Sequence, residues 1–218
     1  MDFEAVLFDC DGVLVDSEPI TNGVLRDMLE ESGWSLTPQE CMRIFLGKAV
    51  RDERARIEHH TGQPLTEAWM QRFYERRNVR LRAELQTVPG ALEAVEAAHA
   101  CTGGRIACAS GADRLKVEFQ IDQAGMRPYF QDRIFSGHEC ARSKPAPDVY
   151  LRAADSVAVA PQRCLVIEDT VTGVQAGVAA GATVWAYCHH PDEGDALLQA
   201  GAALLFGHMG ELVHLWGV

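Results

Sequence analysis

The chain has 218 residues, of which 47% are hydrophobic, and a formal net charge of −11. This length suits one large domain, or a core domain with a modest insertion, and it can bury a core without disulfides or a structural metal. The negative charge argues against a nucleic acid or an anionic membrane as partner. No apolar run approaches the roughly 18 residues that span a bilayer.

The amino-terminal residues and the cysteines indicate a cytoplasmic protein. The chain begins MDFEAVLFD, with acidic residues and no basic segment, so we expect no signal peptide. Seven cysteines occur, and no C-x-x-C pair is present. Cys10, Cys108 and Cys164 lie in or beside apolar, strand-like runs, where cysteine usually serves as a small hydrophobic residue. We therefore expect reduced thiols.

Short apolar runs alternate with stretches of helical spacing over most of the chain. The runs cover 5–9, 105–109, 133–135, 164–167, 182–187 and 202–206. Helical spacing is found over 112–124, 148–154 and 171–180. Gly181 is placed to end the last of these helices. Such runs are typical of buried parallel strands, and their alternation with helices predicts an α/β core with a parallel sheet.

Residues 18–86 interrupt this alternation. They show helical spacing over 24–31, 51–59 and 67–85, and glycines and prolines separate these stretches. Pro89 and Gly90 mark the return to the alternating pattern. We therefore predict two domains, a core formed by 1–17 and 87–218 and an inserted all-helical domain over 18–86.

Acidic residues follow two of the predicted strands. Asp9 and Asp11 are two positions apart, so in a strand they point the same way, and Glu168 and Asp169 follow the run 165–167. Ligands of open α/β sheets bind beyond the carboxyl ends of the strands. Carboxylates gathered there repel one another and favour a bound Mg²⁺, although each pair taken alone also suits a turn or a helix cap.

Two further segments suit a phosphate group. Ser110 and Gly111 follow a strand-like run directly before a predicted helix, where a hydroxyl and backbone N–H groups can bind an anion; the alternative is a simple helix cap. Lys144 lies in the proline-rich stretch SKPAP and is one of only three lysines in the chain. A lone lysine usually faces solvent, but beside the acidic pairs and Ser110 we predict a binding role.

These segments together resemble the four-motif signature of the haloacid dehalogenase superfamily. The matching stretches are DCDGVLVDS from Asp9, ASG around Ser110, KPAP from Lys144 and EDTVTG from Glu168. The resemblance runs in order from about residue 5 to 185, nearly the whole chain. It implies a Rossmann-like core of five to six strands, and the helical insertion resembles the C1-type cap of subfamily I.

The resemblance also implies a mechanism. Asp9 is expected to be the nucleophile that forms an aspartyl-phosphate, and Asp11 the acid and base. Ser110, Gly111 and Lys144 are expected to bind the phosphate. Mg²⁺ is expected at Asp9, Asp169, Glu168 and Asp11, the last through its backbone carbonyl. Dehalogenases of this superfamily lack an acid at the second position, so Asp11 favours a phosphatase.

Substrate selection is expected in the cap. There, Gly47 and Lys48 form the predicted specificity turn, with a solvated Lys48 as the equal alternative. The arginines at 76, 77, 80 and 82 are interpreted as a solvated surface, and His189 and His190 as a loop without a metal role. The overall pattern resembles bacterial sugar-phosphate phosphatases, including the 6-phosphogluconate type.

The expected function is hydrolysis of a small phosphorylated metabolite, with a sugar or sugar-acid phosphate favoured, by a monomer or weak dimer. One alternative is a phosphotransferase like β-phosphoglucomutase. Relatives of that type carry a histidine early in the cap, and Thr21 occupies the equivalent position here. A second alternative is a non-catalytic module that binds a phosphorylated metabolite, against which the set of Asp9, Asp11, Lys144 and Asp169 argues.

Overall fold

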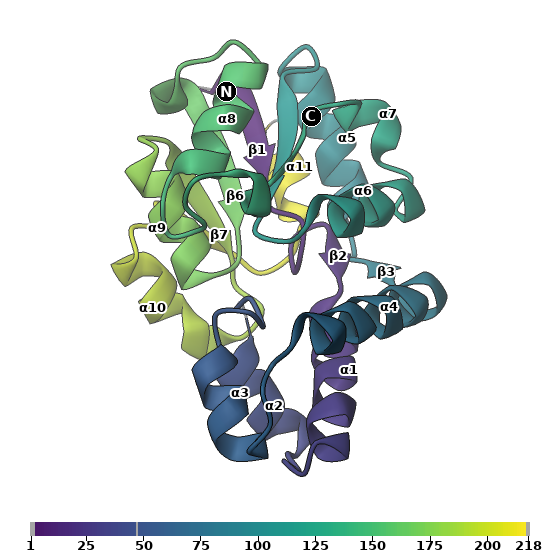
Figure 1. The fold of residues 1–218 in the computed structure, drawn as a ribbon. Coiled ribbons are helices and arrows are strands. Elements are labelled where there is room, and N and C mark those ends of the chain that lie inside the picture. Colours follow the sequence, from purple (N-terminus) through teal and green to yellow (C-terminus); the bar gives the residue numbers. More distant parts are fainter. Residues whose placement is uncertain (1–2, 47, 217–218) are drawn as a thin grey trace. The chain divides into compact units, whose positions relative to one another are not determined.

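The computed structural model describes residues 3–46 and 48–216 (Figure 1). The chain divides into two compact units. The core unit comprises Met1–Val15 and Thr87–Val218, and the helical unit comprises Asp16–Gln86. The chain passes between them through β2 (Val15–Asp16) and β3 (Gln86–Thr87), which form a two-stranded sheet.

A six-stranded parallel sheet forms the centre of the core unit. Its strands, in the order β5-β4-β1-β6-β7-β8, all pair in parallel. They are β1 (Ala5–Phe8), β4 (Ile106–Ser110), β5 (Ile134–Ser136), β6 (Cys164–Glu168), β7 (Thr183–Tyr187) and β8 (Leu204–Phe206). Each lies on one of the apolar runs of the sequence. The predicted α/β class with a Rossmann-like sheet is therefore confirmed.

Helices cover the sheet on two sides (Figure 1). On one side α8 (Asp148–Ser156) contacts β1, β4 and β5, α9 (Val171–Ala179) contacts β6 and β7, and α10 (Gly194–Gln199) contacts β8. The others are α5 (Ala91–Cys101), α6 (Arg114–Gln123), α7 (Arg127–Phe130) and α11 (Glu211–Leu215), with short 3-10 turns η1 (Gly137–Glu139), η2 (Pro161–Arg163) and η3 (Pro191–Glu193). Of these, α5 contacts α7 and α11, α6 contacts β5, and α7 contacts β4.

The strand register brings the carboxyl ends of the central strands level. Phe8 of β1 lies opposite Cys108 of β4 and Ile167 of β6. The residues that follow these positions are therefore neighbours at one edge of the sheet. Asp9 is fixed there by its backbone N–H, which donates to the carbonyl of Ile167 at 2.9 Å. Buried side chains from the sheet and from α8 and α9 form the hydrophobic core beneath this edge.

The helical unit has a core of its own. Its helices are α1 (Glu18–Glu31), α2 (Pro38–Phe45), α3 (Arg54–Thr61) and α4 (Glu67–Glu84), and α1 contacts both α2 and α4. Val24, Met28 and Phe73 are among the side chains buried between them. One expectation was wrong: Arg77 is buried, with its guanidinium 4.9 Å from the ring centroid of Tyr74.

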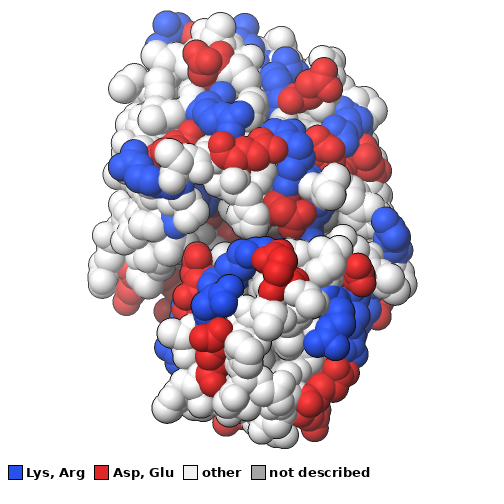
Figure 2. Space-filling view, in the orientation of Figure 1, with Lys and Arg blue, Asp and Glu red and all other residues white. Residues whose placement is uncertain are grey.

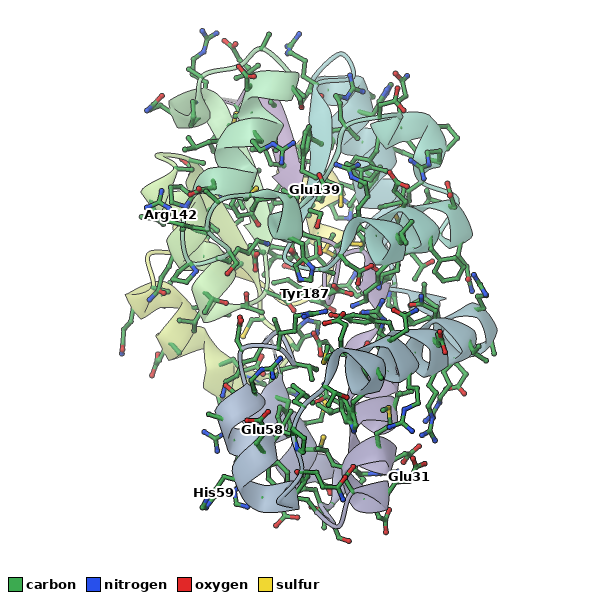
Figure 3. All side chains as sticks on the ribbon, viewed as in Figure 1. Glu31, Glu58, His59, Glu139, Arg142 and Tyr187 are labelled. Atoms are coloured by element: carbon green, nitrogen blue, oxygen red, sulfur yellow. The ribbon has the colours of Figure 1, made fainter. Side chains whose placement is uncertain are left out.

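Charged side chains of both signs lie on the surface of the protein. On the face shown in Figure 2, lysine and arginine side chains of the described residues are interleaved with aspartate and glutamate. Arg76, for example, pairs with Glu31, which lies on α1 (Figure 3). Within residues 3–46 and 48–216, no helix is long and apolar enough to cross a membrane.

Candidate active site

A buried ion pair lies at the carboxyl edge of the sheet. Lys144 Nζ lies 2.5 Å from Asp9 Oδ1, which follows β1, and 2.6 Å from Glu168 Oε1 at the end of β6. The side chains of Lys144 and Asp9 are each 9% exposed, and that of Glu168 is 1% exposed. Lys144 reaches this place from the loop before α8, and its ammonium also donates to the carbonyl of Ala109 at 3.1 Å. Residues separated by 135 positions thus meet in one cluster.

Both oxygens of Glu168 are engaged by the protein. Oε1 accepts hydrogen bonds from Lys144 and from the hydroxyl of Tyr150, the latter at 2.8 Å. Oε2 accepts from the backbone N–H groups of Asp169 and Thr170, both at 3.0 Å, and from the Thr170 hydroxyl. With both oxygens engaged in this way, a role of Glu168 as metal ligand stays a prediction. Its contact with Lys144 holds the ammonium in place.

Asp169 carries the oxygen that best suits a cation. Its Oδ1 is buried and accepts no hydrogen bond from the described residues, whereas Oδ2 lies 3.1 Å from His189 Nε2. An unpartnered buried carboxylate oxygen indicates a missing partner. His189 packs on Tyr187, which lies at the carboxyl end of β7 (Figure 3), with ring centroids 4.3 Å apart. The sequence interpretation placed His189 in a loop and did not predict its contact with Asp169.

The donor set around Asp169 fits Mg²⁺. In the part of the chain that the structure describes, no group of three or more His, Cys, Asp or Glu side chains is arranged to hold a metal ion. Mg²⁺ does not need such a group, since it is commonly held by one or two carboxylates together with water and phosphate oxygens. Asp9, the unpartnered oxygen of Asp169 and a backbone carbonyl are ligands of this kind.

Burial has the largest effect on the pKa values of the carboxylates in this cluster. Burial raises the pKa of Asp9 well above its usual range; Lys144 opposes this shift and Glu168 adds to it. Burial also raises the pKa of Asp169, to about 6, against the opposing effect of His189. Burial favours the neutral form of Glu168 too, but Lys144 and the hydrogen bonds outweigh it and lower its pKa. A bound cation would favour the ionised forms of Asp9 and Asp169.

Asp11 lies beside this cluster in contact with α6. Its Oδ1 is 2.7 Å from Lys116 Nζ and accepts a hydrogen bond from Gln120 Nε2 at 2.8 Å. Gly12 follows with φ of +81°, and an added Cβ there would overlap the carboxylate of Asp169. Only glycine fits this turn. The D-x-D-G motif thus brings the first loop against the end of β6.

The loop after β4 is longer than expected, because the next helix does not begin directly after Ser110 and Gly111. Ser110 is the last residue of β4, and its Oγ accepts a hydrogen bond from the backbone N–H of Ala112 at 3.0 Å. The helix begins only at Arg114, and Asp113 caps it by accepting from the N–H of Lys116. Ser110 is therefore not a helix cap. Gly111 is exposed directly after the strand, where its backbone is accessible to a ligand.

The predicted specificity turn belongs to the helical unit. Gly47 lies outside the described residues. Lys48 is partly exposed and pairs with Glu53, with Nζ 3.5 Å from Oε1. A second role for Lys48 toward a substrate stays a prediction.

Several side chains of the site carry no motif signal. Tyr150, Lys116 and Gln120 lie on helices at spacings that also suit core or surface positions. Lysine is rare in this chain, and Lys116 is the one whose rarity could have drawn attention to it. Gly173, whose added Cβ would overlap the Glu168 carboxylate, belongs to the EDTVTG motif, but its reason is visible only in the structure.

The chain matches known proteins over most of its length. The family model described as haloacid dehalogenase-like hydrolase matches residues 3–181. The 6-phosphogluconate phosphatase of Escherichia coli K12 is 32% identical over 216 residues, which cover 98% of this chain and 94% of that protein.

Solved structures agree with this match. A HAD family hydrolase from Deinococcus radiodurans R1, crystallised with bound phosphate and sodium, superposes with a TM-score of 0.78 at 34% identity and covers 97% of this chain and 93% of its own. A putative β-phosphoglucomutase from Thermotoga maritima has the same TM-score at 28% identity and covers 97% of both chains.

The fold is a Rossmann-like α/β core in which a carboxylate paired with a buried lysine follows the first strand of a parallel sheet. The chain belongs to the haloacid dehalogenase-like hydrolase family, and it is a phosphatase.

Proposed function

We propose that this protein is a Mg²⁺-dependent phosphatase that hydrolyses a phosphorylated sugar or sugar acid through an aspartyl-phosphate on Asp9. The observation that carries the proposal is the position of the Lys144 ammonium, 2.5 Å from Asp9 and held on its other side by Glu168. A carboxylate fixed beside a buried cation is suited to receive a phosphoryl group.

Attack by Asp9 divides the hydrolysis into two displacements. In the first, a carboxylate oxygen of Asp9 bonds to phosphorus and the bond to the leaving alcohol breaks. In the second, water attacks the aspartyl-phosphate, and inorganic phosphate leaves with Asp9 regenerated. A carboxylate that approaches a dianionic phosphate meets a repulsion of roughly 8 kcal/mol at 4 Å and an effective dielectric near 20, so the site must supply positive charge.

Lys144 and a cation supply that charge. Lys144 is fixed by Glu168 and Tyr150, so it needs no reorganisation when the phosphoryl group arrives. The pKa of Lys144 is raised well above its usual value, because Asp9 and Glu168 outweigh the effect of burial, and it is therefore an ammonium at neutral pH. Mg²⁺, when held by Asp9, Asp169 and the Asp11 carbonyl, adds charge stabilisation to the transferring group.

Asp11 moves the protons. It donates one to the leaving alkoxide in the first displacement and accepts one from the attacking water in the second. Ser110 and Gly111 are proposed to bind the phosphoryl oxygens through a hydroxyl and backbone N–H groups. The helical unit is proposed to act as the cap that selects the substrate, with Gly47 and Lys48 in its specificity turn.

The names of two relatives support the proposed substrate class. The Escherichia coli protein is named 6-phosphogluconate phosphatase, and a Thermotoga maritima protein that is 29% identical over 204 residues is named phosphorylated carbohydrates phosphatase. Both names describe phosphate esters of sugars or sugar acids. We propose the same class here, in a cytoplasmic enzyme.

A phosphate-release screen tests the proposal. The protein is incubated with a panel of sugar phosphates, sugar-acid phosphates and phosphoglycolate, with Mg²⁺ and with a chelator. We expect release only with Mg²⁺ and a fall of at least about 10³-fold in Asp9→Asn. Asp132→Asn, an exposed aspartate of the same unit, is the matched control. Unchanged phosphate release in Asp9→Asn would contradict the assignment of Asp9 as nucleophile. If the wild-type protein releases phosphate from no ester, the result favours a binding module.

One alternative has an observation in its favour. The structure of a putative β-phosphoglucomutase from Thermotoga maritima covers 97% of this chain. A phosphotransferase would convert hexose phosphates into isomers. Product analysis by NMR with glucose 1-phosphate separates the two, because free phosphate without an isomer supports the hydrolase.

A further inference from the structure

Two side chains of α6, one helical turn apart, contact the same oxygen of Asp11. Lys116 and Gln120 are four residues apart, so they lie on one face of the helix. Their donor atoms lie 2.7 and 2.8 Å from Asp11 Oδ1. Lys116 is 6% exposed and Gln120 is fully buried. Neither residue belongs to the four motifs of the sequence.

Both partners can only donate to this oxygen. A lysine ammonium has no acceptor. The amide of Gln120 presents its NH₂ group, because its Oε1 accepts from the thiol of Cys10 at 3.5 Å. An oxygen that accepts two such hydrogen bonds has no geometry in which it also carries a proton toward them. The proton that Asp11 exchanges is therefore excluded from Oδ1 and belongs on Oδ2.

The burial of Lys116 is costly for a purely structural residue. Removing an ammonium from water costs several kcal/mol unless it is paired, and an apolar side chain of similar size would fill the same space without that cost. Among the described residues, the pairing partner of Lys116 is Asp11 itself. The lysine thus lies where its charge acts on the proton-transfer group.

We propose that Lys116 and Gln120 are positioning residues that clamp Oδ1 of Asp11 and so direct proton exchange with the leaving group and water to Oδ2. The inference rests on the proposed function. Both helix residues act through Asp11 and do not themselves touch the reacting atoms. The clamp therefore matters most where the leaving group needs a proton.

Leaving-group dependence tests the clamp. An alkoxide must be protonated as it departs, whereas 4-nitrophenolate leaves without a proton. Lys116→Met removes the ammonium and keeps an unbranched side chain. We expect its kcat/KM to fall about 10²-fold on the alkyl phosphate that the screen ranks first, and by less than about threefold on 4-nitrophenyl phosphate. Because kcat/KM reports the first displacement, the later attack of water does not obscure the comparison.

Matched variants separate positioning from stability. Leu115→Met changes the exposed neighbour on the same helix to the same residue and should leave both substrates unaffected. Lys116→Arg should recover most of the alkyl activity. If thermal denaturation shows that Lys116→Met does not fold, Gln120→Met serves as the second variant because it removes the other donor. We expect its kcat/KM to fall about tenfold on the alkyl phosphate, with the same selectivity between the two substrates.

Two outcomes overturn the clamp while the proposed function stands. An equal loss on both substrates, or weaker binding of inorganic phosphate by calorimetry with Mg²⁺, would make Lys116 a phosphate ligand or a structural residue. Wild-type protein without phosphate release on either substrate would instead remove the proposed function, and the clamp with it.

Discussion

Gly173 leaves the space in which Glu168 contacts Lys144. A Cβ at this position would overlap the Glu168 carboxylate, although Gly173 has an ordinary helical conformation. Glu168 in turn accepts from Lys144 at 2.6 Å. A single methyl group in the first turn of α9 therefore acts two contacts away, on the ammonium beside Asp9.

We expect Gly173→Ala to lose activity out of proportion to its effect on stability. Overpacking of this kind costs about 1–3 kcal/mol, which a domain of this size can tolerate. Phosphate release should fall by about 10²-fold or more, because Glu168 must leave its place beside Lys144. Thermal denaturation and kcat/KM are the measurements. Gly207→Ala, whose Cβ would meet only ordinary contacts, is the control; an active Gly173→Ala would contradict the argument.

At the scale of elements, α6 carries the side chains that hold Asp11, and a single residue fixes where this helix begins. Asp113 accepts from the backbone N–H of Lys116 at 3.0 Å, as an N-cap does. The helix start determines which residues face Asp11, because one residue of shift rotates the helix by about 100°. Its cap therefore links local stability to the site.

Asp113→Ala should lower the free energy of unfolding by about 1 kcal/mol. In a chain of this length that corresponds to a fall of roughly 2–4 °C in Tm. Asp113→Asn keeps a capping oxygen and should remain near the wild-type value. Differential scanning calorimetry measures both. Equal melting of the alanine and wild-type proteins would show that the cap does not stabilise the helix.

For the whole molecule, we expect the carboxylates at the sheet edge to make stability depend on pH and on the proposed Mg²⁺. Asp169 has a pKa of about 6 in the folded chain, above its ordinary value of 3.8. Between these values the folded state binds more protons than the unfolded state. The contribution of Asp169 to the stability of the fold is therefore complete at low pH and is lost as pH rises through about 6.

We expect that, with a chelator present, the free energy of unfolding falls between about pH 5 and about pH 7 by about 1 kcal/mol more in the wild type than in Asp169→Asn. Urea denaturation at the two pH values measures the difference. Mg²⁺ at 100 times its Kd should stabilise the wild type by about 2.7 kcal/mol near pH 7, and Asp169→Asn much less. Parallel pH profiles of the two proteins would show that Asp169 does not carry the linkage.

Local patterns in the sequence were enough to predict the strands of the sheet and the polar residues at their carboxyl ends. Apolar runs of three to six residues are local signals, and all six of the predicted strands are present. Parallel pairing then places the carboxyl ends of β1, β4 and β6 at one edge of the sheet, so Asp9, Ser110 and Glu168 could be grouped from the sequence.

Only the tertiary structure decided which contacts each side chain makes at that edge. Glu168 contacts Lys144, and Asp113, not Ser110, caps α6. Gln120 meets Asp11 across 109 positions of the chain. Such contacts have no period and no motif, because they depend on how helices pack on the sheet and on which oxygens remain unpaired after packing. The residue types and their order thus determined the chemistry that is possible, and packing determined which atoms perform it.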